Sequence, residues 1–357
     1  MTIMKGFLTL AAFKKATVWG TPVLCAAGDG LALSSESIAT DPETIEDEQN
    51  EANGVQRLPD IGNQMFGGSI AMPARYEGLE VILAQVFGTA GVPTTVDTTA
   101  RKHVFKINDT LEGIFGTLLL DRKVHIAEFT TFKWTGFTLR VGQGKRATLE
   151  MRGCAHGVNL NTSAGTNTQA LFASVTLPAN REFLQFRQMV IRANAQAAGA
   201  LAAGDALLQV NEVTIEVDRA LKTDDVNTEF GNRISEPTGD AFTTVKVSIS
   251  FSKLQDGTGG SAAQYILQLS KAAQKMDITF TGDTLAGAAT SKFAWTLYLN
   301  SVVFKSGTPN IQGQSLSPFT ISGQAYRVLT IPTGFPATYT NALTMEVVSQ
   351  RVGDALA

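Results

Sequence analysis

Acidic side chains crowd one short stretch in the first third of the chain, and their spacing is the most suggestive of chemistry. The stretch contains Asp41, Glu43, Glu46, Asp47, Glu48 and Glu51. A calcium loop places oxygen ligands at alternating positions around a glycine at its sharp turn, and Gly54 follows too late to be that glycine. Two interpretations stay open: a solvated loop with a helical turn, or a charged arm that contacts a neighbouring subunit, because like charges discourage the loop from packing on itself.

Motifs typical of enzymes are missing from the sequence. It contains no G-x-S-x-G elbow, H-E-x-x-H helix, EF-hand loop or P-loop. Gly67-Gly68-Ser69 has the composition of a phosphate-binding loop but not its Lys-Ser/Thr ending, so a bend is the simpler interpretation. His103, His125 and His156 lie far apart in the sequence. We therefore predict that the protein is not an enzyme and binds neither a cofactor nor a metal ion.

Composition and charge limit the classes of protein that fit. Hydrophobic residues make up 44% and charged residues 17% of the 357 residues, which indicates a folded chain with a sizeable core. A net charge of −3 does not favour a protein that grips nucleic acid through its phosphates. Cys25 and Cys154 form no C-x-x-C motif and no disulfide framework, which indicates assembly in a reducing compartment.

The apolar stretch near the N-terminus, residues 7–13, is too short to span a bilayer. Lys14 and Lys15 follow it instead of the small residues of a cleavage site. We therefore expect a soluble protein that is not exported and has no membrane partner.

The sequence repeats one pattern in its two halves. Ala-Ala-Gly-Asp occurs at residues 26–29 and again at 202–205, and each copy precedes an alternating run that is typical of a strand. An acidic polar loop follows in each half, and then a further predicted strand. The two runs are residues 31–38 and 207–215, the loops are residues 41–57 and 222–236, and the further strands are residues 67–73 and 243–251.

A helix and a strand pair complete each half. Helical apolar spacing predicts one helix over Leu79–Phe87, stopped by Gly88, and another over Tyr265–Met276. The predicted closing strands are residues 129–141 with 147–155, and residues 293–304 with 317–326. Trp134 and Trp295 lie on these strands, where a tryptophan is more often part of the core than of a sugar or base platform.

These patterns predict a mainly β protein with two tandem β-sandwich or barrel domains, each with one flanking α-helix. We place the first domain at residues 1–165, an irregular linker at 166–182 and the second domain at 183–357, and we interpret the two as copies of one ancestral domain.

Lys15-Ala16-Thr17-Val18-Trp19-Gly20-Thr21-Pro22-Val23 is similar to the opening of phage tail tube proteins. In that family a lysine, a threonine, an aromatic residue and Gly-Thr-Pro-Val precede the first strand. The order of elements after it, including Ser35-Glu36-Ser37 on the first strand, also resembles the family. The second half departs from this pattern because it has no Gly-Thr-Pro-Val counterpart.

The resemblance implies a structural virion protein whose subunits form stacked rings around a lumen through which the genome leaves. A chain with two tube domains would complete such a ring as a homotrimer with pseudo-sixfold symmetry, and a homohexamer is the alternative. Other expected partners are the tape measure, terminator and distal tail proteins, and DNA would be only a transient, non-specific passenger in the lumen. The expected location is the virion tail.

The two acidic loops, within residues 39–66 and 219–242, are the predicted contacts between rings. The residues predicted to carry these contacts are Asp41, Glu43, Glu46, Asp47, Glu48, Glu51, Arg57, Asp224, Asp225, Glu229 and Arg233. Because strand alternation gives two faces without distinguishing them, the sequence does not determine which face lines the lumen.

Three other functions remain open at this point. The chain could be another tail part, such as a tube terminator or connector. It could be a carbohydrate-binding β-sandwich adhesin, which would need an exposed aromatic platform or a calcium site and would be a monomer. It could also be a β-rich hydrolase, although no spacing of its acids suggests a catalytic pair.

Overall fold

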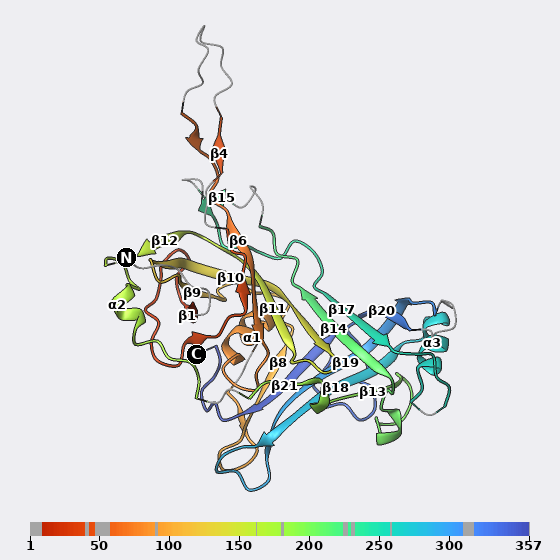
Figure 1. Ribbon diagram of the computed structural model, residues 1–357. Helices are drawn as coiled ribbons and strands as arrows, with labels where there is room; N and C mark the ends of the chain where they lie inside the picture. Colours follow the sequence, from red (N-terminus) through yellow and green to blue (C-terminus); the bar gives the residue numbers. More distant parts are fainter. Residues whose placement is uncertain are drawn as a thin grey trace.

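The computed structural model describes residues 9–39, 43–46, 58–89, 92–161, 163–179, 182–223, 228–229, 233–257, 259–309 and 318–356. The protein is mainly β, as predicted (Figure 1). The elements up to residue 172 are β1 (Leu10–Ala16), β2 (Gly30–Leu31), β3 (Ser35–Glu36), β4 (Thr44–Ile45), β5 (Asp60–Ile61), β6 (Phe66–Pro73), α1 (Glu80–Phe87), β7 (Thr94–Thr95), β8 (Arg101–Lys106), β9 (Phe115–Asp121), β10 (Ile126–Gly142), β11 (Thr148–Ala155), β12 (Val158–Asn161) and α2 (Gln169–Phe172).

The remaining elements follow in the second half. They are β13 (Met189–Ala195), β14 (Val210–Asp218), β15 (Thr228–Glu229), β16 (Arg233–Ile234), β17 (Thr244–Phe251), α3 (Ser261–Leu269), β18 (Gln274–Thr284), β19 (Lys292–Ser306), β20 (Phe319–Ala325) and β21 (Leu343–Ser349), with 3-10 turns at Phe186–Gln188 and Ala203–Asp205.

Strand pairing follows the same order in the two halves. In the first half, neighbouring strands run β1–β9–β10–β11–β6–β3, and all pairs are antiparallel. In the second half they run β13–β18–β19–β20–β17–β14, again antiparallel. Each order matches the other strand by strand, with α1 between β6 and β9 and α3 between β17 and β18 along the chain.

The longest strand of each half changes partners along its length. The first part of β10 lies between β9 and β12, and its last part lies between β11 and β14. The β10–β11 register shifts between Trp134 and Gly136, which marks a bulge at Thr135. The β19–β20 register shifts between Phe304 and Ser306, the same place in the second half. Because a bulge bends a strand and increases its twist, it redirects the strand from one layer to the next.

Two ladders join the halves into one hydrogen-bonded sheet. Residues 136–142 of β10 pair with residues 212–218 of β14, and β8 pairs with β21. Buried side chains from both halves form one continuous hydrophobic core. A smaller cluster on the other face of β1 and β9 lies beneath the α2 segment through Phe172 and Val175.

The helix predicted over Leu79–Phe87 is confirmed as α1. It ends at Gly88, whose φ of 79° is in the left-handed region that glycine adopts readily. The second predicted helix, Tyr265–Met276, is wrong at both ends: α3 spans Ser261–Leu269, and Met276 lies on β18. The backbone leaves the helix at Lys271, where φ is 53°. Met276 is buried between strands, and a buried strand and a helix turn can show the same apolar spacing.

Three other regions differ from the prediction. The run at 31–38 was expected to be one strand and forms two short ones, β2 and β3. The connection at 160–182 is not wholly irregular, since it contains α2, whose N-terminal cap is Thr168. Strand β9 escapes an alternation-based prediction because every one of its residues is buried, on both faces of the sheet.

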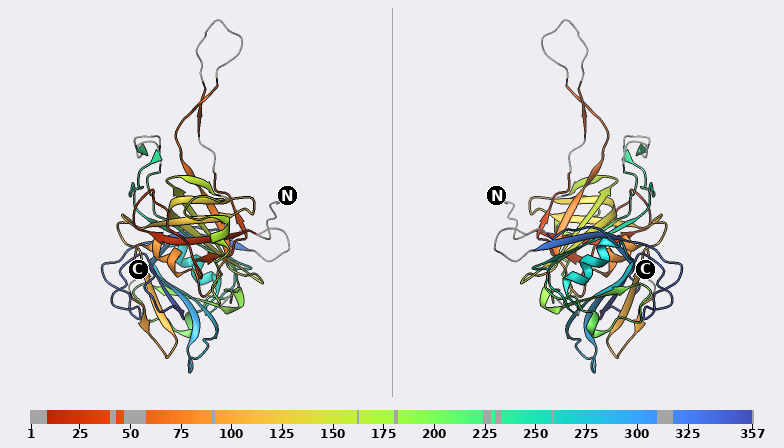
Figure 2. Two further views of the ribbon diagram at one scale, coloured as in Figure 1. Left: turned by 90° about the vertical axis from the view of Figure 1, so that its left-hand side faces the viewer. Right: turned by 90° about the vertical axis from the view of Figure 1, so that its right-hand side faces the viewer.

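A hairpin arm projects from the body of the molecule. Strands β4 and β5 pair at Thr44–Ile61 and Ile45–Asp60. Both views in Figure 2 show this hairpin outside the packed strands. Among the residues described above, none forms a helix long and apolar enough to cross a bilayer.

Candidate assembly and lumen surface

One continuous sheet face presents polar side chains from both halves. The sheet runs β3–β6–β11–β10–β14–β17–β20–β19, and its inward-pointing residues belong to the core. We call the opposite side the polar face. Its residues are Ser37, Ser69, Glu150, Arg152, Thr138, Arg140, Glu212, Thr214, Glu216, Lys246, Ser248, Ser250, Thr320, Ser322 and Gln324.

Strict alternation separates the polar face from the core. On β14, Val213, Ile215 and Val217 are buried, and the residues between them are half-buried. On β17, the apolar residues are likewise buried and Lys246 is exposed. Because successive side chains of a strand point to opposite sides, this pattern fixes the register of each strand in the sheet.

Ion pairs join the polar face across the boundary between the halves. Arg152 Nη2 lies 3.1 Å from Glu216 Oε1, and Lys246 Nζ lies 3.5 Å from Glu216 Oε2. Arg140 Nε lies 3.3 Å from Glu212 Oε1. Each of these cations is therefore matched by a nearby carboxylate, which limits the positive potential that the face offers to a phosphate.

The β17–β20 sector of the polar face is lined by hydroxyl groups. Ser248 Oγ and Ser322 Oγ lie 3.2 Å apart, and Ser250 Oγ lies 2.8 Å from Thr320 Oγ1. Ser37 and Ser69 make a similar pair in the first half, 3.1 Å apart. These small hydroxyl side chains are bonded to each other and carry no charge.

Glycines let the strands approach closely at the polar face. A Cβ placed on Gly136 would lie 2.2 Å from the backbone oxygen of Val217 on β14. Gly136 also lies opposite Arg152 on β11 and Asp218 on β14. With no side chain at Gly136, the guanidinium of Arg152 reaches over β10 to Glu216.

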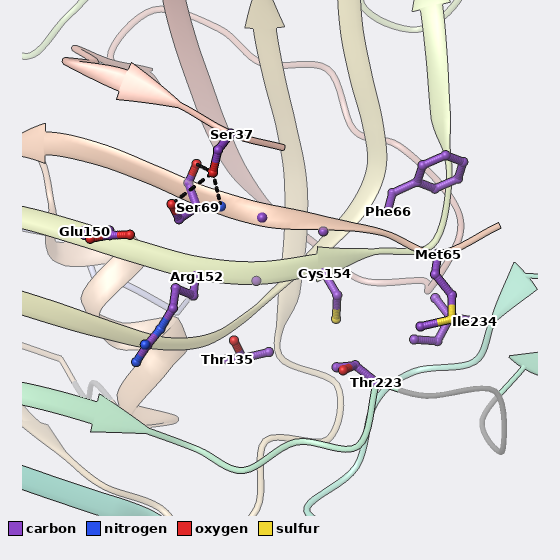
Figure 3. A pocket seen from close by; sticks show the side chains of 13 residues that line it. Ser37, Met65, Phe66, Ser69, Thr135, Glu150, Arg152, Cys154, Thr223 and Ile234 are labelled. Carbon is purple, nitrogen blue, oxygen red and sulfur yellow. Dashed lines mark hydrogen bonds between the residues drawn. The ribbon is translucent and has the colours of Figure 1, made fainter. Parts of the chain in front are cut away.

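A shallow groove of about 560 Å³ opens on the first-half part of the polar face. Figure 3 shows the hydroxyls of Ser37 and Ser69 facing each other, with Glu150 and Arg152 on the neighbouring strand. The predicted bend at Gly67-Gly68 lies within β6 and lines this groove. A Cβ on Gly68 would lie 2.4 Å from the Ser37 oxygen, so a glycine at this position lets the chain at the end of β3 approach β6 closely.

A buried charge marks the junction between the halves. Lys133 of β10 is 1% exposed and its ammonium binds the Glu236 carboxylate. Burial lowers the pKa of Lys133, and the hydrogen bond that its ammonium donates to Glu236 opposes that shift. Arg219, which directly follows β14, is also buried, and burial lowers its pKa to about 10. Breaking such a pair leaves an uncompensated charge, so the junction depends on both halves being present.

The predicted inter-ring residues are only partly within the described chain. Glu43 and Glu46 are exposed and flank β4 on the hairpin arm. Arg233 is exposed on β16, and a bridge between Gln64 and Arg233 brings the second loop against the base of the arm. Outside the described residues, or without a described side chain, lie Asp41, Asp47, Glu48, Glu51, Arg57, Asp224, Asp225 and Glu229.

Sequence reasoning missed the charged residues of the polar face. Arg152, Glu216 and Lys246 each alternate with buried apolar neighbours, and that alternation was the available signal. The sequence did not reveal that β14 neighbours β10, which is the contact that brings Arg152 and Glu216 together.

The predicted core positions are confirmed. Trp134 and Trp295 are each 1% exposed, so neither offers a stacking platform. Cys25 and Cys154 are free and buried, and burial raises the pKa of each thiol to about 12.

A comparison with protein families adds an independent observation. The family model described as phage tail tube protein matches residues 6–342. No curated protein matches the chain.

Proposed function

Since the chain belongs to the phage tail tube protein family and is therefore a structural component of the virion tail, we propose that it assembles into the stacked rings of the tail tube. In this proposal three copies close each ring with pseudo-sixfold symmetry, and the stacked rings enclose the channel through which the genome leaves. A homohexamer of whole chains is the alternative.

The observation that carries the proposal is the continuous polar face. Strands β3, β6, β11 and β10 of the first half are succeeded in the same sheet by β14, β17, β20 and β19 of the second. The matching strand order supports a duplicated domain, in which the halves occupy equivalent places around a ring. Domain limits at residues 1–165 and 183–357, with a linker at 166–182, are part of this proposal.

We place the polar face toward the lumen. Its cations are matched by carboxylates and its remaining side chains are mostly hydroxyls. A channel of this kind neither binds DNA phosphates tightly nor repels them strongly, because both effects require a large net charge. DNA then passes as a transient, non-specific passenger.

The hairpin arm and the β15–β16 loop are the proposed contacts between successive rings. The arm projects from the body and carries exposed Glu43 and Glu46, and Arg233 lies at its base. Tape measure, terminator and distal tail proteins are the further partners of the tube, and assembly takes place in the host cytoplasm.

Electron microscopy of the purified protein at rising concentration tests the proposal. Rings or tubes whose averaged symmetry is threefold for whole chains are the expected result. True sixfold symmetry of whole chains would replace the trimer with the hexamer. Rings that never stack would favour a terminator or connector, and a monomer at high concentration would overturn the tube function.

A variant that removes the arm tests the stacking contact. The Glu43 N–H donates to the Asn63 oxygen at 3.1 Å, so the two residues are already paired across the hairpin. Replacing residues 44–62 with an Asn-Gly turn should therefore close the hairpin without disturbing the body. We expect rings that no longer stack. The matched control, Glu43→Gln with Glu46→Gln, keeps the arm and removes only the two charges that flank β4, leaving Asp60 on β5. Normal tubes from the shortened variant would exclude the arm as a ring-to-ring contact.

A further inference from the structure

We propose that the β3 edge of one copy pairs with the end of β19 of a second copy, repeating between chains the contact that β14 and β10 make within one chain. This inference rests on the proposed function and adds the identity and register of the strands that meet.

The β-bulges align the end of β19 with the end of β10. The bulge at Thr135 of β10 corresponds to Lys305 of β19, because each lies between the two residues where the register shifts. Thr138 lies three residues after the bulge of β10, and Thr308 lies three residues after the bulge of β19. Thr138 faces Glu216 of β14, so Thr308 is the residue expected to face the partner strand.

Pairing with the neighbouring strand aligns β3 with β14. Ser37, directly after β3, donates its N–H to the Ser69 oxygen of β6, and Thr214 of β14 faces Ser248 of β17. Ser69 of β6 faces Arg152 of β11, and Ser248 of β17 faces Ser322 of β20. Arg152 and Ser322 each directly precede a glycine, Gly153 or Gly323, that pairs with the residue before the bulge. Ser69 and Ser248 are therefore equivalent. Ser37 therefore corresponds to Thr214, and Ala39 corresponds to Glu216. The pair Thr138–Glu216 within the chain becomes Thr308–Ala39 between chains.

Neither edge has a second strand beside it in the described part of the single chain. β3 pairs only with β6 there, and residues 303–306 of β19 pair only with β20. The Lys271 ammonium donates to the Lys305 oxygen at 2.6 Å, where the equivalent Thr135 oxygen accepts the N–H of Arg219, so a side chain covers this position of the β19 edge in the single chain. The Ile38 N–H donates to Glu36 Oε2 at 3.1 Å, so a charged side chain covers an amide at the β3 edge. The equivalent residue of β14, Ile215, lies opposite Leu139 of β10 instead. A charged side chain on an open edge discourages indiscriminate strand pairing, which is how soluble proteins protect such edges.

A second copy is the occupant that these edges fit, because the chain already contains the matching contact. An unrelated strand would have to reproduce the bulge and the register that β10 and β14 share. Heterologous contacts of this type close into a ring when the rotation per subunit divides a full turn. The polar face would then continue from one chain into the next.

The contact between copies should be the weaker of the two. Pro309 takes the position of Leu139 and has no N–H to donate, so the new ladder misses a bond there. The β8–β21 ladder also has no counterpart, since residues 270–273 alone connect α3 to β18. The contact within a chain therefore has two ladders, and the proposed contact between chains has one.

Paired cysteines test the register. Ala39 and Thr308 are both exposed, and antiparallel partners at a non-hydrogen-bonded pair bring their side chains close enough for a disulfide. A chain carrying A39C and T308C, oxidised after assembly, should give linked dimers and trimers on a non-reducing gel. Mixing chains that carry only A39C with chains that carry only T308C should give linked dimers alone. The buried native thiols need not be removed.

Two controls decide the outcome. T138C with E216C tests the same geometry within the chain and should form an internal disulfide without linked dimers. A39C with S322C moves one partner to the next strand and should link poorly. Rings by electron microscopy without A39C–T308C links would overturn the register and leave the tube function standing. An unmodified chain that forms no rings at all would overturn both.

Discussion

The two halves share one strand order, but only the first carries an insertion between its helix and the next strand. Residues 88–114 connect α1 to β9 and include β7 and β8, whereas residues 270–273 connect α3 to β18. Strand β8 covers the edge of β21, and Asp97 beside β7 accepts hydrogen bonds from Ala289 and Ser291 of the second half. The insertion is therefore a clamp from the first half onto the second.

In the proposed assembly, two halves with the same strand order would therefore make two unequal contacts. The junction within a chain combines the β10–β14 ladder, the β8–β21 ladder and the buried Lys133–Glu236 pair. The described residues between α3 and β18 contain no counterpart of β8, so the second half has no strand there to form a second ladder with a neighbouring chain. In the proposed ring, we therefore expect the junction within a chain to be more stable than the contact between copies.

Breaking the junction strand should have the largest effect. Ile215→Pro removes an N–H from the middle of β14, which lies between β10 and β17, and empties a side-chain site that is 1% exposed. Backbone disruption and lost packing together should cost at least about 5 kcal/mol of unfolding free energy. Urea denaturation would measure it. The equivalent Ile38 is also buried, at 4% exposed, but its N–H bonds to Glu36 and not to a second strand. Ile38→Pro should therefore lose packing without breaking a ladder and cost less than Ile215→Pro; equal losses in both variants would refute the distinction between the two edges.

Removing the anchor of the insertion should have the next largest effect. Phe105 on β8 is fully buried and packs on Phe87 of α1, with ring centroids 6.0 Å apart. Phe105→Ala should lower the unfolding free energy by about 3–4 kcal/mol. Val104→Ala, on the other side of the same strand, is the matched control and should lower it by about 1 kcal/mol. A loss below that of the control would mean that the clamp is not anchored through this ring.

The carboxyl of Glu77, shortly before α1, makes the stability of the first half depend on pH. Burial, with a smaller contribution from Glu80, raises the pKa of Glu77 from 4.5 to about 7, and Arg351 opposes the shift. Because the folded-state pKa is above the unfolded one, the stabilising effect is present below pH 4.5 and is lost as pH rises toward 7.

Glu77→Gln should therefore be more stable than the natural chain near pH 8, by roughly 2 kcal/mol, and nearly equal to it near pH 4. Denaturation curves at both pH values would measure this difference. Glu150→Gln, at an exposed position, is the control. The same stability difference at both pH values would show that Glu77 does not titrate in this window.

The smallest expected effect comes from making the first half resemble the second on the polar face. Arg152 occupies the position that Ser322 has on β20, and it pairs with Glu216 at 3.1 Å. Arg152→Ser should lower stability by at most about 1 kcal/mol, because the pair is partly exposed and screened by salt. Thermal melts at low and high salt would measure it, with Arg140→Ser as the control. A loss well above this at high salt would mean that Arg152 acts through packing rather than charge.

Much of the fold follows from local patterns that tertiary contacts did not override. The strict alternation of β17 and the apolar spacing of α1 predicted both elements, and Gly88 predicted the end of the helix. The resemblance at Lys15–Val23 agreed with the family match. Local patterning also placed Trp134 and Trp295 in the core.

Other features required the folded chain. Strand β9 is buried on both faces and Met276 faces the core from a strand, so neither has the periodicity that distinguishes strand from helix. Of the clustered acids, Glu43 and Glu46 lie on the projecting arm, whereas the pairing of Arg152 with Glu216 across the sheet was not predicted.

The sequence by itself determined the class of fold, the repeated order of elements and the family, because each depends on periodicity or on residues close together in the chain. Only the tertiary structure decided that β14 lies beside β10 and β8 beside β21. Those pairings join segments far apart in the sequence, and strand alternation specifies which side of a strand is apolar without specifying its neighbour. The position of the polar face, and hence of the proposed lumen, depends on that choice of neighbours.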